Sequence, residues 1–272
     1  MSYKLRKISA ALGYCSKPDF IIIGAQKAGT TALYFMLKGH SLVAGANSKE
    51  IHYFDNDEWY SRKKLYEYHA HFQLPYKMKR NSLFFEATPS YLYHPRVAKR
   101  LYDYNPNLRL IVVLRDPAFR ALSAWTMYHH HFKTGHQKYL HDDRSFSEAI
   151  AEDLKNIDAD NYYSNHKGYI KRGLYYEQIK EYLNYFNPGQ ILIIDYNELK
   201  NHVSETVKKI CNFLNIPVEN LHVEVLNKSK GESKNSYLTE IEMLKEFYLP
   251  HNKKLYDLLK KDFSWDFISA NQ

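Results

Sequence analysis

Residues 20–31 read FIIIGAQKAGTT, and this stretch decides the fold of the chain. Its apolar, β-branched start predicts a buried strand, and a helical pattern begins at Thr31, directly after a loop bounded by Gly24 and Gly29. A strand, a glycine-bounded loop and a helix N-terminus together present backbone N–H groups and the positive end of a helix dipole. The stretch therefore predicts a loop that binds phosphate.

The loop departs from the pattern of enzymes that use nucleoside triphosphates. Their pattern, GxxxxGK[ST], has a lysine directly after the second glycine, whereas this chain has Thr30 there and carries its lysine earlier, at Lys27. The lysine that normally reaches the β- and γ-phosphates is therefore missing. This argues against a kinase or an ATPase and favours a nucleotide with one terminal phosphate group.

Strand and helix patterns alternate along the rest of the chain. Three further strands are predicted at 83–87, 109–114 and 190–195, and the last two are apolar almost throughout. Such continuous apolar runs are typical of parallel strands that are covered on both faces. Helices are predicted at 31–38, 95–102, 117–132, 146–154, 174–186, 205–214 and 238–261.

This alternation indicates an α/β fold. We expect a P-loop-like three-layer domain with a central parallel sheet flanked by helices. No repeat or low-complexity linker interrupts the pattern, so the sequence predicts a single domain over 1–272, with its core at about 18–266. The polar stretches 40–60, 133–145, 155–170 and 226–236 are predicted to be loops that form the walls of a cleft.

Composition limits the location of the protein. The 272 residues are 44% hydrophobic and 25% charged, which is ordinary for a globular domain. No apolar run approaches the ~18 residues of a membrane span, and the apolar run 8–12 is too short for a signal peptide. We therefore expect a cytoplasmic protein with no membrane span. Cys15 and Cys211 have no paired spacing, so both are expected to be reduced thiols.

The charge and the aromatic content bear on the partners. A formal net charge of +8 indicates an anionic partner, which could be a nucleotide, an acidic glycan or a nucleic acid. The basic residues are scattered and form no recognised nucleic-acid motif, which disfavours the third class. The 25 tyrosines fit either ordinary packing or an aromatic cleft for sugar rings or bases.

A second stretch, LIVVLRDPAFRALS at 110–123, repeats the logic of the first loop. A buried strand ends at Arg115, and Pro117 begins a helix that carries Ser123. Arg115 would lie where parallel sheets bind ligands, and a guanidinium with a hydroxyl suits a phosphate monoester. The structural alternative is an Arg115 that pairs with Asp116 or caps a carbonyl. Two phosphate sites on neighbouring strands favour a nucleotide phosphorylated at two distant positions.

The two motifs together resemble those of the sulfotransferase superfamily that uses 3′-phosphoadenosine 5′-phosphosulfate (PAPS). More narrowly, the chain looks like the heparan sulfate type of carbohydrate sulfotransferase. The supporting segments are KEIHYFD at 49–55, FEATPSY at 85–91 and KSKG at 228–231, and the similarity runs from about residue 18 to about residue 266. The resemblance implies one sulfotransferase domain that moves the sulfuryl group of PAPS to a hydroxyl or amine, releases 3′-phosphoadenosine 5′-phosphate (PAP) and needs no metal. A carbohydrate is the favoured acceptor.

The resemblance also implies which residues bind the nucleotide. The first loop would hold the 5′-phosphosulfate, and the second motif the 3′-phosphate. A late loop would close over the nucleotide; relatives often carry a basic residue after its glycine, where this chain has Glu232 and the nearest replacement is Lys234. The family's frequent disulfide before this loop is absent, which is consistent with a bacterial member. The implied nucleotide-binding residues are Lys27, Ala28, Gly29, Thr30, Thr31, Arg115, Ser123, Lys230, Gly231 and Lys234.

Sulfuryl transfer needs a base for the acceptor and positive charge at the leaving phosphate. The resemblance implies Glu50 as the base and Lys27 as the group that stabilises the leaving phosphate. His52 is the alternative base, because cytosolic small-molecule sulfotransferases use a histidine. An extended segment would place Glu50 and His52 on one face. The structural alternatives are a Glu50 that pairs with Lys49 and a His52 that packs in the core.

Three further residues are predicted to contact the acceptor or to orient the base. Lys49 and Asp55 flank the candidate base, and Glu86 lies on a predicted strand, either facing the cleft or buried beside a lysine. Adjacent histidines on a helix do not converge, so residues 129–131 are not expected to bind a metal. Other readings stay open. They are a sulfotransferase for a lipid, polyketide or other small metabolite, a P-loop kinase, and a nucleic-acid-binding module.

Overall fold

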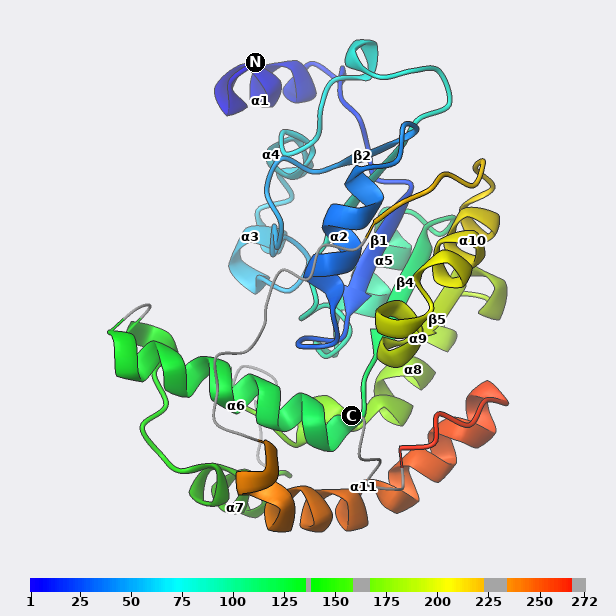
Figure 1. Ribbon diagram of the computed structural model, residues 1–272. Coiled ribbons are helices and arrows are strands. Elements are labelled where there is room, and N and C mark those ends of the chain that lie inside the picture. Colours follow the sequence, from blue (N-terminus) through cyan, green and yellow to red (C-terminus); the bar gives the residue numbers. More distant parts are fainter. Residues whose placement is uncertain (136–137, 159–166, 223–233, 266–272) are drawn as a thin grey trace. The chain divides into compact units, whose positions relative to one another are not determined.

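A computed structural model describes residues 1–135, 138–158, 167–222 and 234–265 (Figure 1). The chain divides into two compact units. The first unit comprises Met1–Leu114 and Glu181–Leu226, and the second comprises Arg115–Lys180 and Asn227–Gln272. The sequence predicted a single domain, and because the chain divides into two compact units, that single domain stays a prediction.

The first unit contains a five-stranded parallel sheet with the order β2-β3-β1-β4-β5. This confirms the predicted central parallel sheet and its four predicted strands. The prediction of a loop over 40–60 is wrong in part, because β2 lies inside it. With three residues, β2 is too short to show an alternating pattern. The strands are β1 (Phe20–Gly24), β2 (Val43–Gly45), β3 (Leu83–Ala87), β4 (Arg109–Leu114) and β5 (Ile191–Asp195).

The sheet positions the candidate site because its strands run the same way. Phe20 of β1 pairs with Phe85 on one side and with Arg109 on the other. Every residue of β1 is buried, as the continuous apolar pattern predicted. The carboxyl ends of parallel strands share one edge of the sheet, where α/β folds bind their ligands. The phosphate loop leaves β1 at this edge, and residues 88–91 follow β3 there.

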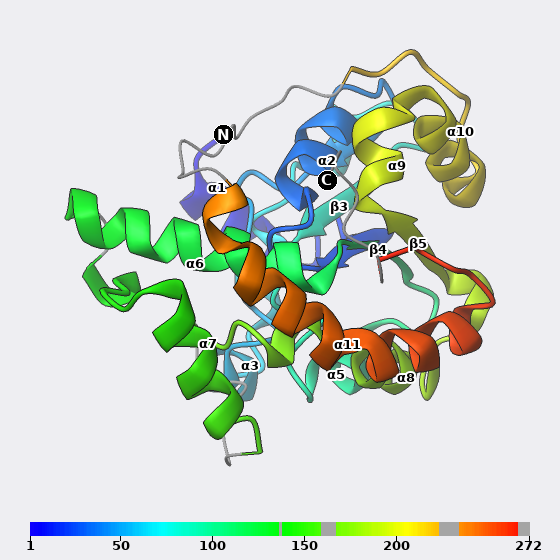
Figure 2. The ribbon, with the colours of Figure 1, turned by 60° about the horizontal axis from the view of Figure 1, so that its bottom comes forward.

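Helices cover both faces of this sheet (Figures 1 and 2). Right-handed crossovers in opposite directions along the sheet place α2 and α5 on opposite faces. The predicted α2, α5 and α10 are confirmed, whereas α3, α4 and α9 were missed because five or six residues are too few to show a helical period. The predictions also missed α1. The helices are α1 (Tyr3–Ala11), α2 (Thr30–Lys38), α3 (Asp57–Ser61), α4 (Leu65–His69), α5 (Val97–Tyr104), α9 (Tyr196–Asn201) and α10 (Val203–Leu214).

The second unit is built from helices. The long helices α6 (Pro117–Thr134) and α11 (Leu238–Leu259) pack together, and α7 (Phe146–Lys155) contacts α6. Trp125 is a buried member of the hydrophobic core that these helices share. All three helices lie where the sequence predicted them. Helix α8 (Tyr175–Leu183), also predicted, begins in the second unit and ends in the first.

Two further predictions concern membrane-spanning helices and the two cysteines. None of the helices found there is long and apolar enough to span a lipid bilayer. Cys15 and Cys211 are both free thiols, as their unpaired spacing predicted.

Candidate functional site

The predicted phosphate loop connects β1 to α2 in the first unit. Gly29 caps α2 with a left-handed φ of +90°. A Cβ at this position would also lie 3.3 Å from side-chain atoms of Tyr196 and of Leu199, at the start and in the middle of α9 respectively. Two features therefore require glycine at position 29: its left-handed backbone angle and the close approach of α9.

The loop has the features of an anion-binding turn. The first N–H groups of a helix have no partner within the helix, and the helix dipole is positive at this end. Helix α2 begins at Thr30, so the backbone of this residue and of Thr31 lies in the first turn. Ala28 and Thr30 are buried, and Lys27 stands on the loop with a φ of +66°. The loop thus brings together the residues that the sequence assigned to it.

The segment Lys49–Asp55 carries the candidate base and begins beside β3. The Glu50 N–H donates to the carbonyl of Ala87, the last residue of that strand, at 3.0 Å. Glu50 and His52 have φ angles of +60° and +58°. The segment is therefore not extended at these two residues, which was the condition under which the sequence placed both side chains on one face. The two side chains do face each other, but two left-handed residues bring them together.

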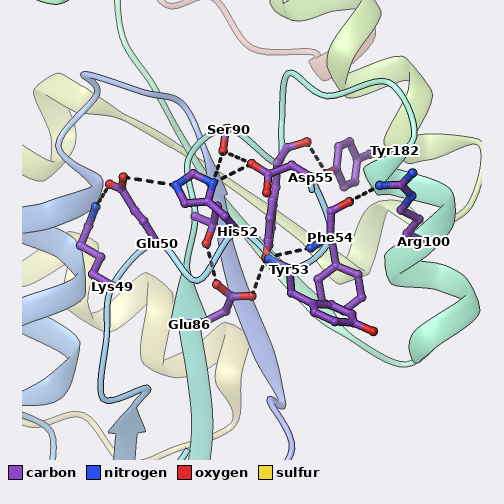
Figure 3. Close-up of polar contacts among 12 residues, drawn as sticks. Lys49, Glu50, His52, Tyr53, Phe54, Asp55, Glu86, Ser90, Arg100 and Tyr182 are labelled. Atoms are coloured by element: carbon purple, nitrogen blue, oxygen red, sulfur yellow. Dashed lines mark hydrogen bonds and ion pairs between the residues drawn. The ribbon is translucent and has the colours of Figure 1, made fainter. Parts of the chain in front are cut away.

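Four charged side chains form a row along this segment (Figure 3). Lys49 Nζ contacts Glu50 Oε1, and Glu50 Oε2 lies 3.8 Å from His52 Nε2. On the other side of the ring, His52 Nδ1 lies 2.8 Å from Asp55 Oδ2. The signs alternate along the row when the imidazole is protonated. The pairing of Glu50 with Lys49 that the sequence left open is therefore present, as one link of this row.

The row sets the protonation states of its members. Partial burial alone would raise the pKa of Glu50, but the ion pairs with His52 and Lys49 outweigh it and lower the pKa to about 2. Burial would lower the pKa of His52, but Asp55 and Glu50 raise it to about 10. At neutral pH Glu50 is therefore ionised and His52 is protonated. A protonated imidazole has no lone pair with which to accept a proton.

The backbone of the same segment is held from two directions. The N–H groups of Tyr53 and Phe54 donate to the hydroxyl of Tyr91 at 3.1 and 3.3 Å. The Arg100 guanidinium, on α5, donates to the carbonyl of Phe54 at 2.7 Å. The Ser90 hydroxyl also contacts the Asp55 carboxylate. Two regions distant in the sequence thus fix one short segment.

Glu86, on β3, differs from its predicted role. Its side chain is completely buried, so its carboxylate has no surface for an acceptor. Oε1 accepts from the hydroxyls of Tyr68 and Tyr91 at 2.9 and 3.1 Å, and Oε2 accepts from Thr88 at 2.7 Å. Burial raises its pKa to about 7 against the opposing effect of these hydrogen bonds. Glu86 is an internal acceptor with hydroxyl donors, not the lysine partner that the sequence also allowed.

The second predicted phosphate motif lies in the second unit. Asp116 caps α6 by accepting from the Ala118 and Phe119 N–H groups at 2.9 and 3.4 Å, and its other oxygen lies 3.1 Å from Lys245 Nζ. Asp116 is thus engaged by groups other than the neighbouring arginine. The carbonyl of Arg115 accepts from the Tyr175 hydroxyl at 2.9 Å. Arg115 and Ser123, both half-buried, keep the placement that the motif predicted, directly after β4 and on α6.

The third predicted nucleotide-binding segment lies only in part within the described residues. Lys230 and Gly231 lie outside the described residues, and Lys234 is described only as the first residue of a 3₁₀ turn, Lys234–Tyr237. Within the ranges that the structure covers, no group of three His, Cys, Asp or Glu side chains is arranged to hold a metal ion. His129 instead stacks on Trp125, with ring centroids 4.7 Å apart.

Sequence reasoning missed three residues that support the candidate site. Ser90 and Tyr91 stand in the quoted stretch 85–91 but were not singled out, because a serine or a tyrosine after a strand carries no functional signal by itself. Arg100 lies on an amphipathic helix, where an arginine usually faces solvent. Only contact with residues distant in the sequence gives these three side chains their positions.

Comparisons with known proteins bear on the family and the fold of this chain. The family model described as "Sulfotransferase domain" matches residues 17–261. The heparan sulfate glucosamine 3-O-sulfotransferase 5 of Mus musculus is 26% identical over 276 residues, covering 91% of this chain and 74% of that protein. The membrane-associated sulfotransferase kil1 of Dictyostelium discoideum is 25% identical over 330 residues, covering 91% and 66%. A crystal structure of a sulfotransferase from Alicyclobacillus acidocaldarius shares the fold, with a TM-score of 0.70 and 24% identity over 93% of this chain and 100% of that one.

Proposed function

The chain belongs to the sulfotransferase family, and from this premise we propose that it transfers the sulfuryl group of PAPS to a carbohydrate hydroxyl or amine, with Glu50 as the base. The observation that carries the proposal is the row Lys49–Glu50–His52–Asp55, which keeps a carboxylate ionised beside the end of β3. Family membership excludes the kinase and nucleic-acid readings that the sequence left open.

The donor is assigned to the two phosphate motifs. The first loop, with Lys27, Ala28, Gly29, Thr30 and Thr31, would bind the 5′-phosphosulfate, since it offers helix N–H groups and a lysine. Arg115 and Ser123 would bind the 3′-phosphate through a guanidinium and a hydroxyl. When bound, PAPS supplies a sulfuryl group on a phosphate that is a good leaving group. The residues of this chain supply binding, alignment and a proton acceptor, and no metal is required in this scheme.

Glu50 is a better candidate for the base than His52. At neutral pH the carboxylate is ionised, whereas the imidazole already holds the proton that a base would take. A pKa of about 2 makes Glu50 a weak base in the resting enzyme. Any approach of Lys49 or His52 to an anionic substrate would withdraw positive charge from Glu50 and raise its basicity. Lys27 would stabilise the charge that grows on the leaving phosphate.

The acceptor class rests on the relatives and on charge. Several relatives are heparan sulfate sulfotransferases by name, and a net charge of +8 favours a polyanionic glycan over a neutral lipid. Lipid, polyketide and other small-metabolite acceptors are the competing outcomes. A cytoplasmic location, as expected from the sequence, stays a prediction.

Nucleotide titrations would test the donor assignment. We expect PAP to bind tightly without a metal and more tightly than ATP, with or without Mg²⁺, in calorimetry. Arg115→Ala should weaken PAP by roughly 10- to 100-fold, because a charged hydrogen bond to the 3′-phosphate is lost. It should leave adenosine 5′-phosphate within about twofold, because that nucleotide has no 3′-phosphate. Equal losses for both nucleotides, or a preference for Mg²⁺-ATP, would contradict the assignment.

A transfer assay would test the acceptor class. The enzyme would be incubated with sulfur-labelled PAPS and a panel comprising N-sulfated and N-acetylated heparan-type polysaccharides, a long-chain alcohol and a phenol. We expect label in the polysaccharides only. Label in the alcohol or phenol alone would replace the carbohydrate acceptor with a small-molecule one and leave the donor assignment intact.

A further inference from the structure

Glu86 is a fully buried carboxylate to which the proposed chemistry gives no part. It lies one residue before Ala87, the residue whose carbonyl accepts from the Glu50 N–H. Its two oxygens accept three hydroxyl hydrogen bonds, from Tyr68, Thr88 and Tyr91. A buried charge is costly, so its position beside the candidate base needs a physical explanation.

The hydroxyl of Tyr91 links Glu86 to the segment that carries the base. A phenol has one proton to donate and two lone pairs to accept with. Here the oxygen accepts from the N–H groups of Tyr53 and Phe54 at 3.1 and 3.3 Å, so its own proton is directed to Glu86, 3.1 Å away. The direction of every bond in this link is therefore fixed, and it requires an acceptor at position 86.

The rest of Tyr91 is also fixed. Its carbonyl accepts from the hydroxyl of Tyr182 at 2.9 Å, and its side chain is completely buried. On the other side of the segment, Arg100 donates to the carbonyl of Phe54 (Figure 3). Tyr53 and Phe54 stand directly between His52 and Asp55, whose side chains are 2.8 Å apart. Movement of these two backbone groups would therefore move the row that holds Glu50.

We propose that Glu86 is a positioning residue for sulfuryl transfer, which acts through Tyr91 to hold the segment of Glu50, His52 and Asp55 in its reactive shape. The inference rests on the proposed function, because it takes Glu50 as the base. Glu86 touches neither substrate, and its effect is carried by one phenol hydroxyl and two backbone N–H groups.

The link does not require Glu86 to be charged. The titratable groups that face Glu86 are phenols and one carboxylate: Tyr34 on α2, Tyr68 on α4, Tyr104 on α5, Tyr91 and Asp55. Burial among them raises the pKa of Glu86 to about 7. A protonated Glu86 can donate from Oε2 to the Thr88 hydroxyl and keep Oε1 as the acceptor for Tyr91. The link therefore needs an acceptor at position 86 but not a charge.

A matched pair of tyrosine variants tests the link. Tyr91→Phe keeps the ring but removes the acceptor of both N–H groups, whereas Tyr68→Phe removes a hydroxyl bonded to the same Glu86 oxygen without any bond to the segment. We expect Tyr91→Phe to lower kcat by roughly 10- to 100-fold, since small misplacements of a reacting group have effects of this size. Tyr68→Phe should cost far less. Equal losses would overturn the proposal.

Hydrogen exchange gives a readout that needs no activity. In Tyr91→Phe the amides of Tyr53 and Phe54 should exchange at least about tenfold faster than in the wild type, and those of β1 should be unchanged. In Tyr68→Phe the two amides should stay protected. Unchanged exchange in Tyr91→Phe would overturn the link itself. If exchange behaves as expected and no sulfuryl transfer is found, the proposed function has failed and the link has not.

Substitutions at Glu86 separate acceptor from charge. Glu86→Gln can turn its carbonyl oxygen to Tyr91 and its amide to the Thr88 hydroxyl, so it should keep kcat at pH 8 within about threefold of the wild type. Glu86→Met, of similar size but without an acceptor for Tyr91, should behave like Tyr91→Phe. A Gln variant that loses as much kcat as Tyr91→Phe, or a Met variant with full activity, would overturn the proposal.

Discussion

Glu50 and Glu86 are two carboxylates of the same unit, joined through the hydrogen bond between the Glu50 N–H and the Ala87 carbonyl, yet their environments are opposite. The Glu50 side chain is 45% exposed and lies between the cations of Lys49 and His52. Glu86 is completely buried and meets only hydroxyl donors. The pKa is about 2 for the first and about 7 for the second.

The difference shows that partners, more than residue type, decide what a carboxylate can do. Cationic neighbours outweigh the desolvation of Glu50 and keep it ionised, which suits a group that receives a proton. Three neutral hydroxyls do not outweigh the desolvation of Glu86, which leaves it able to change charge near neutral pH. This contrast supports the two proposed roles, a base for the exposed carboxylate and a positioning residue for the buried one.

The largest expected effect comes from removing the charge of the exposed carboxylate. Glu50→Gln should lower kcat by roughly 10²- to 10⁴-fold, the usual contribution of a general base, and should leave the affinity for PAP unchanged. Glu58→Gln is the matched control for the loss of an exposed carboxylate, because Glu58, on α3, is exposed and pairs with Arg62. Steady-state rates and PAP calorimetry measure the two quantities. Full activity in Glu50→Gln would show that Glu50 is not the base. The proposed difference in role between Glu50 and Glu86 would then be wrong.

A smaller effect is expected on stability, at the buried carboxylate. Its pKa is about 7 in the folded protein and near 4.5 in the unfolded chain. Below pH 4.5 both states hold the proton, so burial of the neutral acid carries no charge penalty. As the pH rises from 4.5 to 7, the unfolded chain releases its proton first, and the folded state loses up to about 3 kcal/mol of stability.

Glu86→Gln should remove this loss because an amide does not titrate. Urea unfolding at pH 5 and pH 8 would measure it: the wild type should lose stability between the two values, and the variant should lose less by up to about 3 kcal/mol. The same pH dependence in both proteins would show that Glu86 does not titrate in this range. The contrast between the two carboxylates would then lose its electrostatic basis.

The smallest expected effect concerns the partner that keeps Glu50 ionised. His52→Gln removes the imidazolium, so the pKa of Glu50 should rise from about 2 toward its ordinary value of 4.5. The variant also loses the contact between His52 and Asp55 that helps to hold the segment, so we expect kcat to fall by about tenfold although Glu50 becomes more basic. A new acidic limb should appear between about pH 4 and pH 6 in the pH–rate profile. If the profile keeps its shape, His52 does not set the protonation state of Glu50. A loss as large as that of Glu50→Gln would instead favour His52 as the base.

Much of the fold could be predicted because it depends on local pattern. The apolar runs of β1 and β4 and the long helices α6 and α11 each carry enough residues to show their period. The three-residue β2 could not be predicted, since its pairing with β3 is a contact across the chain rather than a local preference. The candidate site shows the same difference between local patterns and contacts across the chain. The loop with Gly29 was visible in the sequence, and the contact of Arg100 with the carbonyl of Phe54 was not.

The sequence by itself determined the phosphate loop, the parallel sheet and the presence of Glu50 and His52 in one short segment, because each depends on residues close together in the chain. Only the tertiary structure decided the charge of each group and the role of Glu86. A pKa depends on burial and on partners brought together by folding, and Tyr68, a hydrogen-bond donor to Glu86, stands 18 residues before it. The same chemical group, placed twice beside one strand, is therefore ionised and exposed in one place, where we propose a base, and buried among hydroxyls in the other, where we propose a positioning residue.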